Sequence, residues 1–378
     1  MGRRKDDGKI TGLSVWDGSP ASAPPVRWSE IASPVVPRQT IVAVEVESAA
    51  STETGVAALT HYAEPEGPTW AAPELESLLS GWLEFPIRAL PHHPSTNNAY
   101  EPWTNPIGAT VALAALDALG RATQLPAATF LGGVCRSKIP AYASLPSFPD
   151  AQAAVACAAS ALDAGFRTVK FHGSGMLDID LETVSKARGE LGPSTQLIWD
   201  GSRAYELHSA EVIGHALAEE GFLWLEAALD DSVAALYRLA RRLKISLVPD
   251  GMAQRSAGDW ARDLRDGIWG ALRLDVTRVE SLPAGLRVVR LAESWGVPCE
   301  IQSFGFPLSQ YANLQLMLAT PACRFFEAPF PQTDFHDGLV TAPSIVDGFV
   351  TIPDSPGLGH GIETERFSEA CKLLARLD

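Results

Sequence analysis

Acidic side chains close three successive apolar segments of the sequence. Asp200 ends "QLIWD", Glu226 ends "FLWLE" and Asp250 ends "ISLVPD", and the separations between them are nearly equal. One such carboxylate is often a turn residue or a helix N-cap. Three at a regular spacing indicate a shared site, where carboxylates repel one another unless a cation lies between them. Because oxygen-only ligands suit Mg²⁺, the sequence predicts a magnesium site held by these three residues.

Lys170 and His172 lie two residues apart in "TVKFHG". In a strand this spacing directs both side chains to the same face. A buried lysine near a divalent cation has a lowered pKa and can act as a base, and a histidine titrates near neutral pH. We expect at least one of the two to be a catalytic base, while the other can be a structural residue.

Alternating strands and helices must position these residues. From about residue 138, short apolar segments alternate with longer amphipathic ones, which is typical of repeated βα units on a parallel sheet. The number of units favours a closed (β/α) barrel over an open sheet, and neither the G-x-G-x-x-G nor the G-x-x-x-x-G-K-[ST] motif supports nucleotide binding. Catalytic residues of such barrels lie at the carboxyl ends of the strands, where these carboxylates fall.

The first 135 residues or so differ from this repeat. "TIVAVEVESA" alternates apolar and polar residues, which predicts a half-buried antiparallel strand. "NPIGATVALAALDALGRATQLP" predicts an alanine-rich helix that stops at Pro126. We therefore expect a separate α+β domain ahead of the barrel.

Composition excludes several classes of partner. The formal net charge is −15, so the chain offers no basic footprint for nucleic acid or an anionic membrane, and an anionic substrate needs a local positive centre. The five cysteines are scattered and favour reduced thiols over disulfides or zinc. No apolar run is long enough to span a bilayer and no signal sequence is recognisable, so we expect a cytoplasmic protein.

Six motifs together resemble the mandelate racemase / muconate lactonizing enzyme family of the enolase superfamily. "TVKFHG" resembles its second-strand Lys-x-Lys, "WDGSRAY" its third-strand Asp-x-Asn, and "WLEAAL" its fourth-strand Glu-Glu-Pro. "LDVTRVESL" resembles the sixth-strand Asp segment, "VALAALDALGRATQLPAATFLGG" the end of the capping domain, and "IVDGFVTIPDSPGLGHGI" the C-terminal signature. The resemblance covers nearly the whole chain.

The resemblance implies three parts. Residues 1–137 would form an α+β capping domain, 138–345 a modified (β/α) barrel, and 346–378 a tail that returns to the cap. It also implies Mg²⁺ bound to a small carboxylate substrate, a base that removes the α-proton, and an enediolate intermediate. Glu327 in "FFEAPF" resembles the eighth-strand glutamate that acts on the substrate carboxylate as an electrophilic acid. A symmetric homo-oligomer is the general expectation.

Departures from the family pattern narrow the reaction. His172 replaces the second Lys, and Met252 takes the usual position of the third metal ligand, so Asp250 is the expected substitute. Asp275 resembles the Asp of the family's Asp–His dyad, but Gln302 stands in place of the His and cannot exchange a proton. We therefore expect a one-base dehydratase of acid sugars, with His172 as base and Lys170 contacting the substrate carboxylate or sharing that duty.

Two alternatives stay open. One is a racemase or epimerase of a 2-hydroxy acid or an amino acid derivative, and the other is a non-catalytic barrel with a degraded metal site. The resemblance assigns substrate choice to cap loops within residues 15–28 and 48–62. Those loops hold polar and aromatic side chains that suit polar or aromatic ligands, namely Trp16, Asp17, Arg27, Trp28 and His61.

Overall fold

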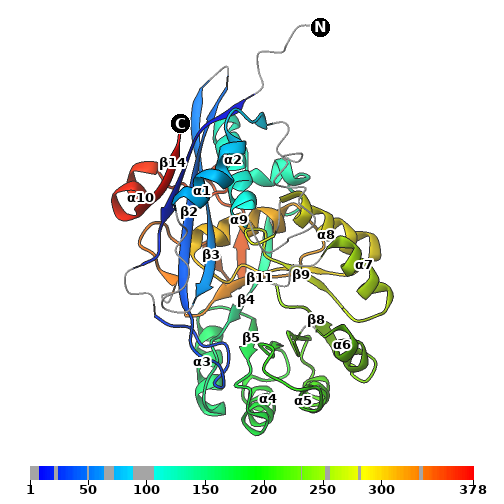
Figure 1. Cartoon of the computed structure of the whole chain (residues 1–378). Helices are drawn as coiled ribbons and strands as arrows, with labels where there is room; N and C mark the ends of the chain where they lie inside the picture. The colour runs from blue at the N-terminus through cyan, green and yellow to red at the C-terminus, as the bar shows by residue number, and fades with distance from the viewer. Residues whose placement is uncertain are drawn as a thin grey trace.

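A computed structural model of the chain consists of an N-terminal sheet domain and a barrel-like set of βα units (Figure 1). It describes residues 8–20, 24–48, 51–63, 72–87, 106–230, 232–251, 256–279, 282–331 and 335–378. The blue N-terminal strands and the red C-terminal segment lie together in Figure 1, beside the green, yellow and orange βα units.

The cap is a four-stranded antiparallel sheet in the order β14-β1-β2-β3. Its strands are β1 (Lys9–Asp17), β2 (Val36–Glu47), β3 (Thr52–Ala63) and β14 (Lys372–Leu377). Two helices accompany it, α1 (Ala72–Leu79) and α2 (Pro106–Thr123), with a 3₁₀ turn after each, at Ser80–Trp82 and Ala127–Leu131. The predicted α+β cap and its alanine-rich helix are present.

The central strand β2 is buried on both faces, whereas the sequence predicted a half-buried strand. Val42 and Val44 pack into the same core as Val111 of α2. Ile41 and Ala43 point the other way and pack with apolar residues of the barrel side, including Leu308. The cap sheet therefore lies between α2 and the barrel, and period-2 alternation could not reveal the second apolar layer.

The βα units follow in the expected order. The strands are β4 (Lys138–Ser144), β5 (Thr168–His172), β6 (Gln196–Asp200), β7 (Trp224–Glu226), β8 (Ser246–Val248), β9 (Leu272–Leu274), β10 (Cys299–Ile301) and β11 (Phe326–Pro329). The helices are α3 (Ala151–Asp163), α4 (Leu177–Leu191), α5 (Leu207–Glu219), α6 (Val233–Ala240), α7 (Ala257–Arg265), α8 (Leu282–Trp295) and α9 (Pro307–Leu318). A capping residue fixes where α3 begins, because the Asp150 side chain accepts a hydrogen bond from the Ala153 amide.

Parallel pairing runs without a break through β11, β4, β5, β6, β7 and β8, and β9 pairs separately with β10. A few hydrogen bonds, rather than a strand ladder, bridge the two gaps in the ring. The Gly270 amide donates to the Leu247 carbonyl at 2.9 Å, and the Ser303 hydroxyl donates to the Glu327 carbonyl at 2.7 Å. The strands thus form a barrel-like ring whose carboxyl ends face one mouth.

The C-terminal segment ties the barrel to the cap. A short hairpin, β12 (Ile345–Val346) and β13 (Phe349–Thr351), adds to the edge of β4, and α10 (Thr364–Ala370) follows it. The last strand, β14, then pairs antiparallel with β1 of the cap. The predicted return of the tail to the cap is confirmed. Within the described residues, no helix combines the length and apolar character needed to cross a membrane.

Candidate active site

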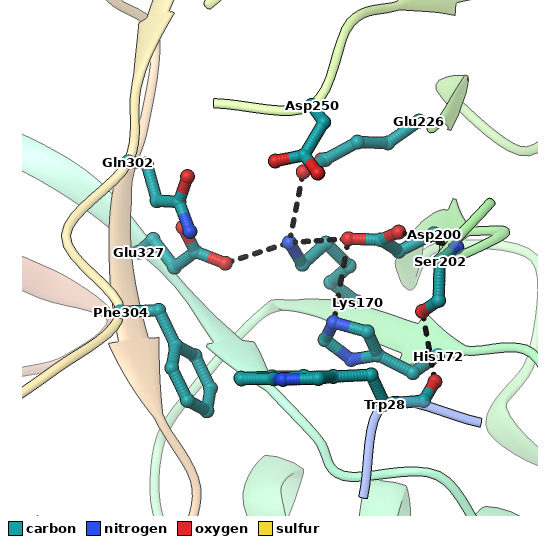
Figure 2. A pocket seen from close by; sticks show the side chains of 10 residues that line it. All are labelled: Trp28, Lys170, His172, Asp200, Ser202, Glu226, Asp250, Gln302, Phe304 and Glu327. Carbon is teal, nitrogen blue, oxygen red and sulfur yellow. Dashed lines mark hydrogen bonds and ion pairs between the residues drawn. The ribbon is translucent and has the colours of Figure 1, made fainter. Parts of the chain in front are cut away.

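A pocket opens at the carboxyl ends of the barrel strands, beneath the cap (Figure 2). Seven of the eight predicted site residues line it, and three further side chains complete its wall. The lining residues are Trp28, Lys170, His172, Asp200, Ser202, Glu226, Asp250, Gln302, Phe304 and Glu327. Parallel register explains the convergence, because His172 pairs with Asp200, and Asp200 in turn pairs with Glu226, at one height of the sheet.

Lys170 lies at the centre of the pocket and contacts three carboxylates. Its Nζ is 3.1 Å from Asp200 Oδ2, 3.3 Å from Glu226 Oε1 and 2.7 Å from Glu327 Oε1 (Figure 2). Its side chain is only 2% exposed. Burial alone would lower the pKa of Lys170, but these carboxylates raise it well above the usual value. These contacts favour an ammonium ion at Lys170 over a share in the duty of base, which stays a prediction.

Arg273 is a second buried cation that the sequence analysis missed. It lies on β9 and is fully buried, with Nε 2.8 Å from Glu226 Oε1 and Nη2 2.6 Å from Glu327 Oε2. Its Nη1 donates to the Tyr142 hydroxyl at 3.3 Å. Its place on strand β9 was predictable, but its partners on β7 and β11 were not.

The two cations set the charge state of the carboxylates. Burial opposes ionisation of Glu327, but Arg273 and Lys170 lower its pKa to about 2. These ion pairs favour an ionised Glu327, whereas its predicted role as an electrophilic acid needs a proton, so that role stays a prediction. Burial raises the pKa of Glu226 to about 8 against the same two cations. The pKa of Asp200 falls well below 3.8, since Lys170 and His172 outweigh its burial.

His172 presents one ring nitrogen to the pocket. Its Nδ1 is 2.5 Å from the Leu145 carbonyl oxygen, and because a carbonyl can only accept, Nδ1 carries a proton. Its Nε2 lies 3.3 Å from Asp200 Oδ2, a contact that is a hydrogen bond when Nε2 is also protonated, whereas in the neutral ring Nε2 carries a lone pair. The rings of Trp28 and Phe304 cover the imidazole at centroid distances of 5.1 and 6.4 Å.

Asp250 does not join Asp200 and Glu226 in a metal-ligand cluster. Its Oδ2 forms an ion pair with Arg203 Nη2 at 2.7 Å. Within the described part of the chain, no group of three or more His, Cys, Asp or Glu side chains is arranged to hold a metal ion. Met252, which occupies the family's ligand position, lies outside the described residues.

On the two remaining predicted ligands, every carboxylate oxygen already has a polar partner. Glu226 Oε1 contacts Lys170 and Arg273, and its Oε2 accepts from the Trp224 indole at 3.3 Å. Asp200 Oδ2 contacts Lys170 and His172, and its Oδ1 accepts from the Ser202 amide at 2.9 Å. Magnesium requires ligand oxygens at about 2.0–2.1 Å in octahedral geometry. The residues as arranged do not fit the predicted magnesium ion.

Asp275 and Gln302 differ in their relation to the pocket. Asp275 is absent from the lining, and its Oδ1 accepts hydrogen bonds from Asn313 and Thr277 at 2.8 Å. It therefore braces the start of the next loop rather than forming a dyad. Gln302 does line the pocket, and its Oε1 is buried without a hydrogen-bond partner within the described residues. Gly251 makes room for it, because any Cβ there would collide with Gln302 Oε1.

The cap contributes Trp28 to the pocket, as the sequence allowed. The Ser202 hydroxyl donates to the Trp28 carbonyl at 2.8 Å, which fixes this cap residue over the barrel mouth. The other proposed cap residues that we named do not line the pocket. Trp16 packs against Phe367, and His61 contacts Thr40 within the cap sheet. Most of the segment 48–62 is strand β3 rather than a loop.

Comparison with known proteins agrees with this architecture. Residues 153–366, more than half of the chain, match the family described as enolase C-terminal domain-like. L-rhamnonate dehydratase of Saccharopolyspora erythraea is 26% identical over 271 residues, covering 68% of this chain and 66% of the relative. D-galactarolactone cycloisomerase of Agrobacterium fabrum is 26% identical over 260 residues, covering 63% of this chain and 67% of the relative. The chain spans about two thirds of the length of these relatives.

Solved structures extend the likeness of fold to nearly the whole chain. A protein of the mandelate racemase/muconate lactonizing enzyme type from Pseudovibrio sp. superposes with a TM-score of 0.89 at 24% identity, covering 98% of this chain and 99% of that one. D-glucarate dehydratase from Agrobacterium tumefaciens, solved with magnesium, gives 0.77 at 22% identity, covering 96% and 99%. The chain belongs to the enolase superfamily, among the mandelate racemases and muconate lactonizing enzymes.

Proposed function

We propose that this chain removes the α-proton of a small carboxylate substrate and expels a β-hydroxyl group, as in the dehydration of an acid sugar. The observation that carries the proposal is the position of His172 in the pocket, with Nδ1 committed to a backbone carbonyl and Nε2 available. The names of relatives support the substrate class, since they include dehydratases of rhamnonate and of cis-3-hydroxy-L-proline.

His172 is the proposed base. Its Nε2 lone pair takes the proton from the α-carbon, and the resulting imidazolium is stabilised by the Asp200 carboxylate 3.3 Å away. The Leu145 carbonyl holds the ring tautomer throughout. The same Nε2 can then return its proton to the departing hydroxyl. The C–O bond breaks, water leaves, and the enol product rearranges to a keto acid, so atoms and charge balance.

Lys170 is the proposed electrophile. Its ammonium lines the pocket and remains charged, so it can attract the substrate carboxylate and stabilise the negative charge that develops on it after proton removal. Superfamily members are magnesium-dependent enzymes, but no step of this proposal passes through a metal. The reason is the arrangement of Asp200 and Glu226: Glu226 Oε1 already accepts from Lys170, and Asp200 Oδ1 from the Ser202 amide.

The pocket supports one base rather than two. Gln302 occupies the wall where a racemase would need a second proton carrier, and an amide does not exchange protons at neutral pH. Racemisation or epimerisation therefore remains the less favoured alternative. The buried Gln302 Oε1 instead offers an acceptor for a hydroxyl or amine of the substrate.

The test is a screen of acid sugars and hydroxy or amino acids in deuterium oxide, followed by ¹H NMR and mass spectrometry. We expect loss of the α-proton signal and loss of water from at least one acid sugar. His172→Asn is expected to reduce both by about a thousandfold, within the range of general-base effects. His208→Asn, on the exposed surface of α5, is the matched control and should keep full activity.

Other outcomes separate the alternatives. Exchange with inversion at the α-carbon and no loss of water would indicate a racemase or epimerase. An equal rate in His172→Asn and wild type would remove His172 as the base. No exchange with any compound in the screen would favour a non-catalytic barrel, for which the close pairing of Lys170 with three carboxylates is the motivating observation.

A further inference from the structure

Two protein cations occupy a carboxylate cluster that contains two of the three expected metal ligands, Asp200 and Glu226. Arg273 bridges Glu226 and Glu327, with nitrogen–oxygen distances of 2.8 and 2.6 Å. Lys170 contacts the same two carboxylates and Asp200 as well. Glu327 has one oxygen on each cation, while Glu226 Oε1 is shared by both. The two side chains therefore crosslink the carboxylates in the way a metal ion would.

The charge of this cluster leaves little attraction for a dication. Three carboxylates, Asp200, Glu226 and Glu327, face two cations within ion-pair distance. One negative charge remains when all groups are ionised, half the charge of Mg²⁺. A guanidinium cannot lose its proton to make room, unlike a lysine ammonium. Arg273 is also 0% exposed, and Tyr142 contacts it from the side, so its charge cannot swing into solvent.

The third predicted ligand has its own cation. Asp250 pairs with Arg203 at 2.7 Å, so a metal ion would have to displace a guanidinium there too. Departures in the sequence agree with this arrangement, because Met252 stands where the family has its third ligand.

We propose that the Arg273 guanidinium and the Lys170 ammonium take the electrostatic place of the family's divalent cation, so that this pocket binds no magnesium. The inference concerns metal binding and does not rest on the proposed function. A substrate screen without turnover leaves it standing, and magnesium binding overturns it whatever the screen gives.

The experiment is isothermal titration of the full chain, stripped with EDTA, with MgCl₂ and separately with MnCl₂. We expect no saturable binding by the wild type at millimolar metal. Asp200→Asn changes the pocket but not the acidic surface, so metal that binds weakly to the surface will bind this variant and the wild type alike. Saturable one-site binding in the wild type that Asp200→Asn abolishes would overturn the proposal.

Variants of Arg273 test its part directly. Arg273→Gln removes the charge, and we expect it to show saturable one-site binding at millimolar magnesium, whereas Arg273→Lys keeps the charge and should show none, like the wild type. Arg324→Gln is the matched control, since Arg324 pairs with the buried Glu300 away from the pocket, and it should gain nothing. A folded Arg273→Gln without gain would contradict the proposal. Should Arg273→Gln fail to fold by circular dichroism, the wild-type and Asp200→Asn titrations decide.

Discussion

The Lys170 ammonium contacts Asp200, Glu226 and Glu327. The effect of removing it on the free energy of unfolding depends on which charges then lack a partner. A buried ion pair contributes little net stability, but breaking one leaves an uncompensated charge. Lys170→Met would leave Glu226 and Glu327 with Arg273, and Asp200 with His172. We expect the free energy of unfolding in urea to fall by about 3–5 kcal/mol.

A surface lysine provides the comparison for that prediction. Lys186 pairs with Glu190 along α4, with the two side chains 28% and 49% exposed. Lys186→Met should cost less than about 1 kcal/mol, because exposed pairs are screened by solvent. Equal losses in the two variants would mean that the central cluster does not depend on Lys170.

Some residues of the site could be predicted from the sequence and others could not. Asp200, Glu226 and His172 were predictable because parallel strands bring equivalent positions to one height. Asp250 lines the pocket as predicted, but its pairing with Arg203 was not predictable, because β8 ends at Val248 and the following residues are free to turn. The partners of Arg273 lie on β7 and β11, and no local pattern links segments so far apart in the sequence.

At the scale of elements, the strand and helix periods predicted the order of the βα units, and the structure agrees with it. The cap was harder, because burial of β2 and β3 on both faces depends on layers supplied by remote segments. Gly55 marks one of these contacts: a Cβ there would collide with the backbone of α2 at Ala114 and Ala118. The sequence shows a glycine in a strand, but not the helix that requires it.

The cap hairpin contains a histidine whose protonation should limit stability in acid. Burial, helped by Arg278, lowers the pKa of His61 on β3 from 6.5 to about 4. The unfolded chain then binds more protons than the folded one between these values, so stability falls as the pH drops from about 6.5 through 4. His61→Asn should flatten the slope there by up to about 1.4 kcal/mol per pH unit.

The measurement is urea unfolding of both proteins at half-unit steps from pH 7 to pH 4. Above pH 6.5 the two curves should run parallel, since the ring is neutral in both states. Identical slopes below pH 6.5 would show that His61 is not the group responsible.

At the scale of the whole molecule, the active site depends on the joining of chain ends that are far apart in sequence. Trp28 of the cap covers His172, and the cap sheet carrying that segment is completed by β14 from the C-terminus. Ala375 of β14 pairs with Val15 and is 5% exposed, whereas Leu373 on the same strand is 44% exposed. One strand therefore offers a buried and an exposed position for the same substitution.

Ala375→Glu would bury a charge between β14 and the cap core, and we expect it to lower the free energy of unfolding by at least about 3 kcal/mol. Leu373→Glu adds the same charge at the exposed position and should change stability by no more than about 0.5 kcal/mol. If β14 also holds the cap over the pocket, Ala375→Glu should raise KM for the substrate found in the screen, whereas Leu373→Glu should leave it unchanged. A destabilised Ala375→Glu with an unaltered KM would mean that Trp28 is held over His172 by the barrel contact at Ser202 alone.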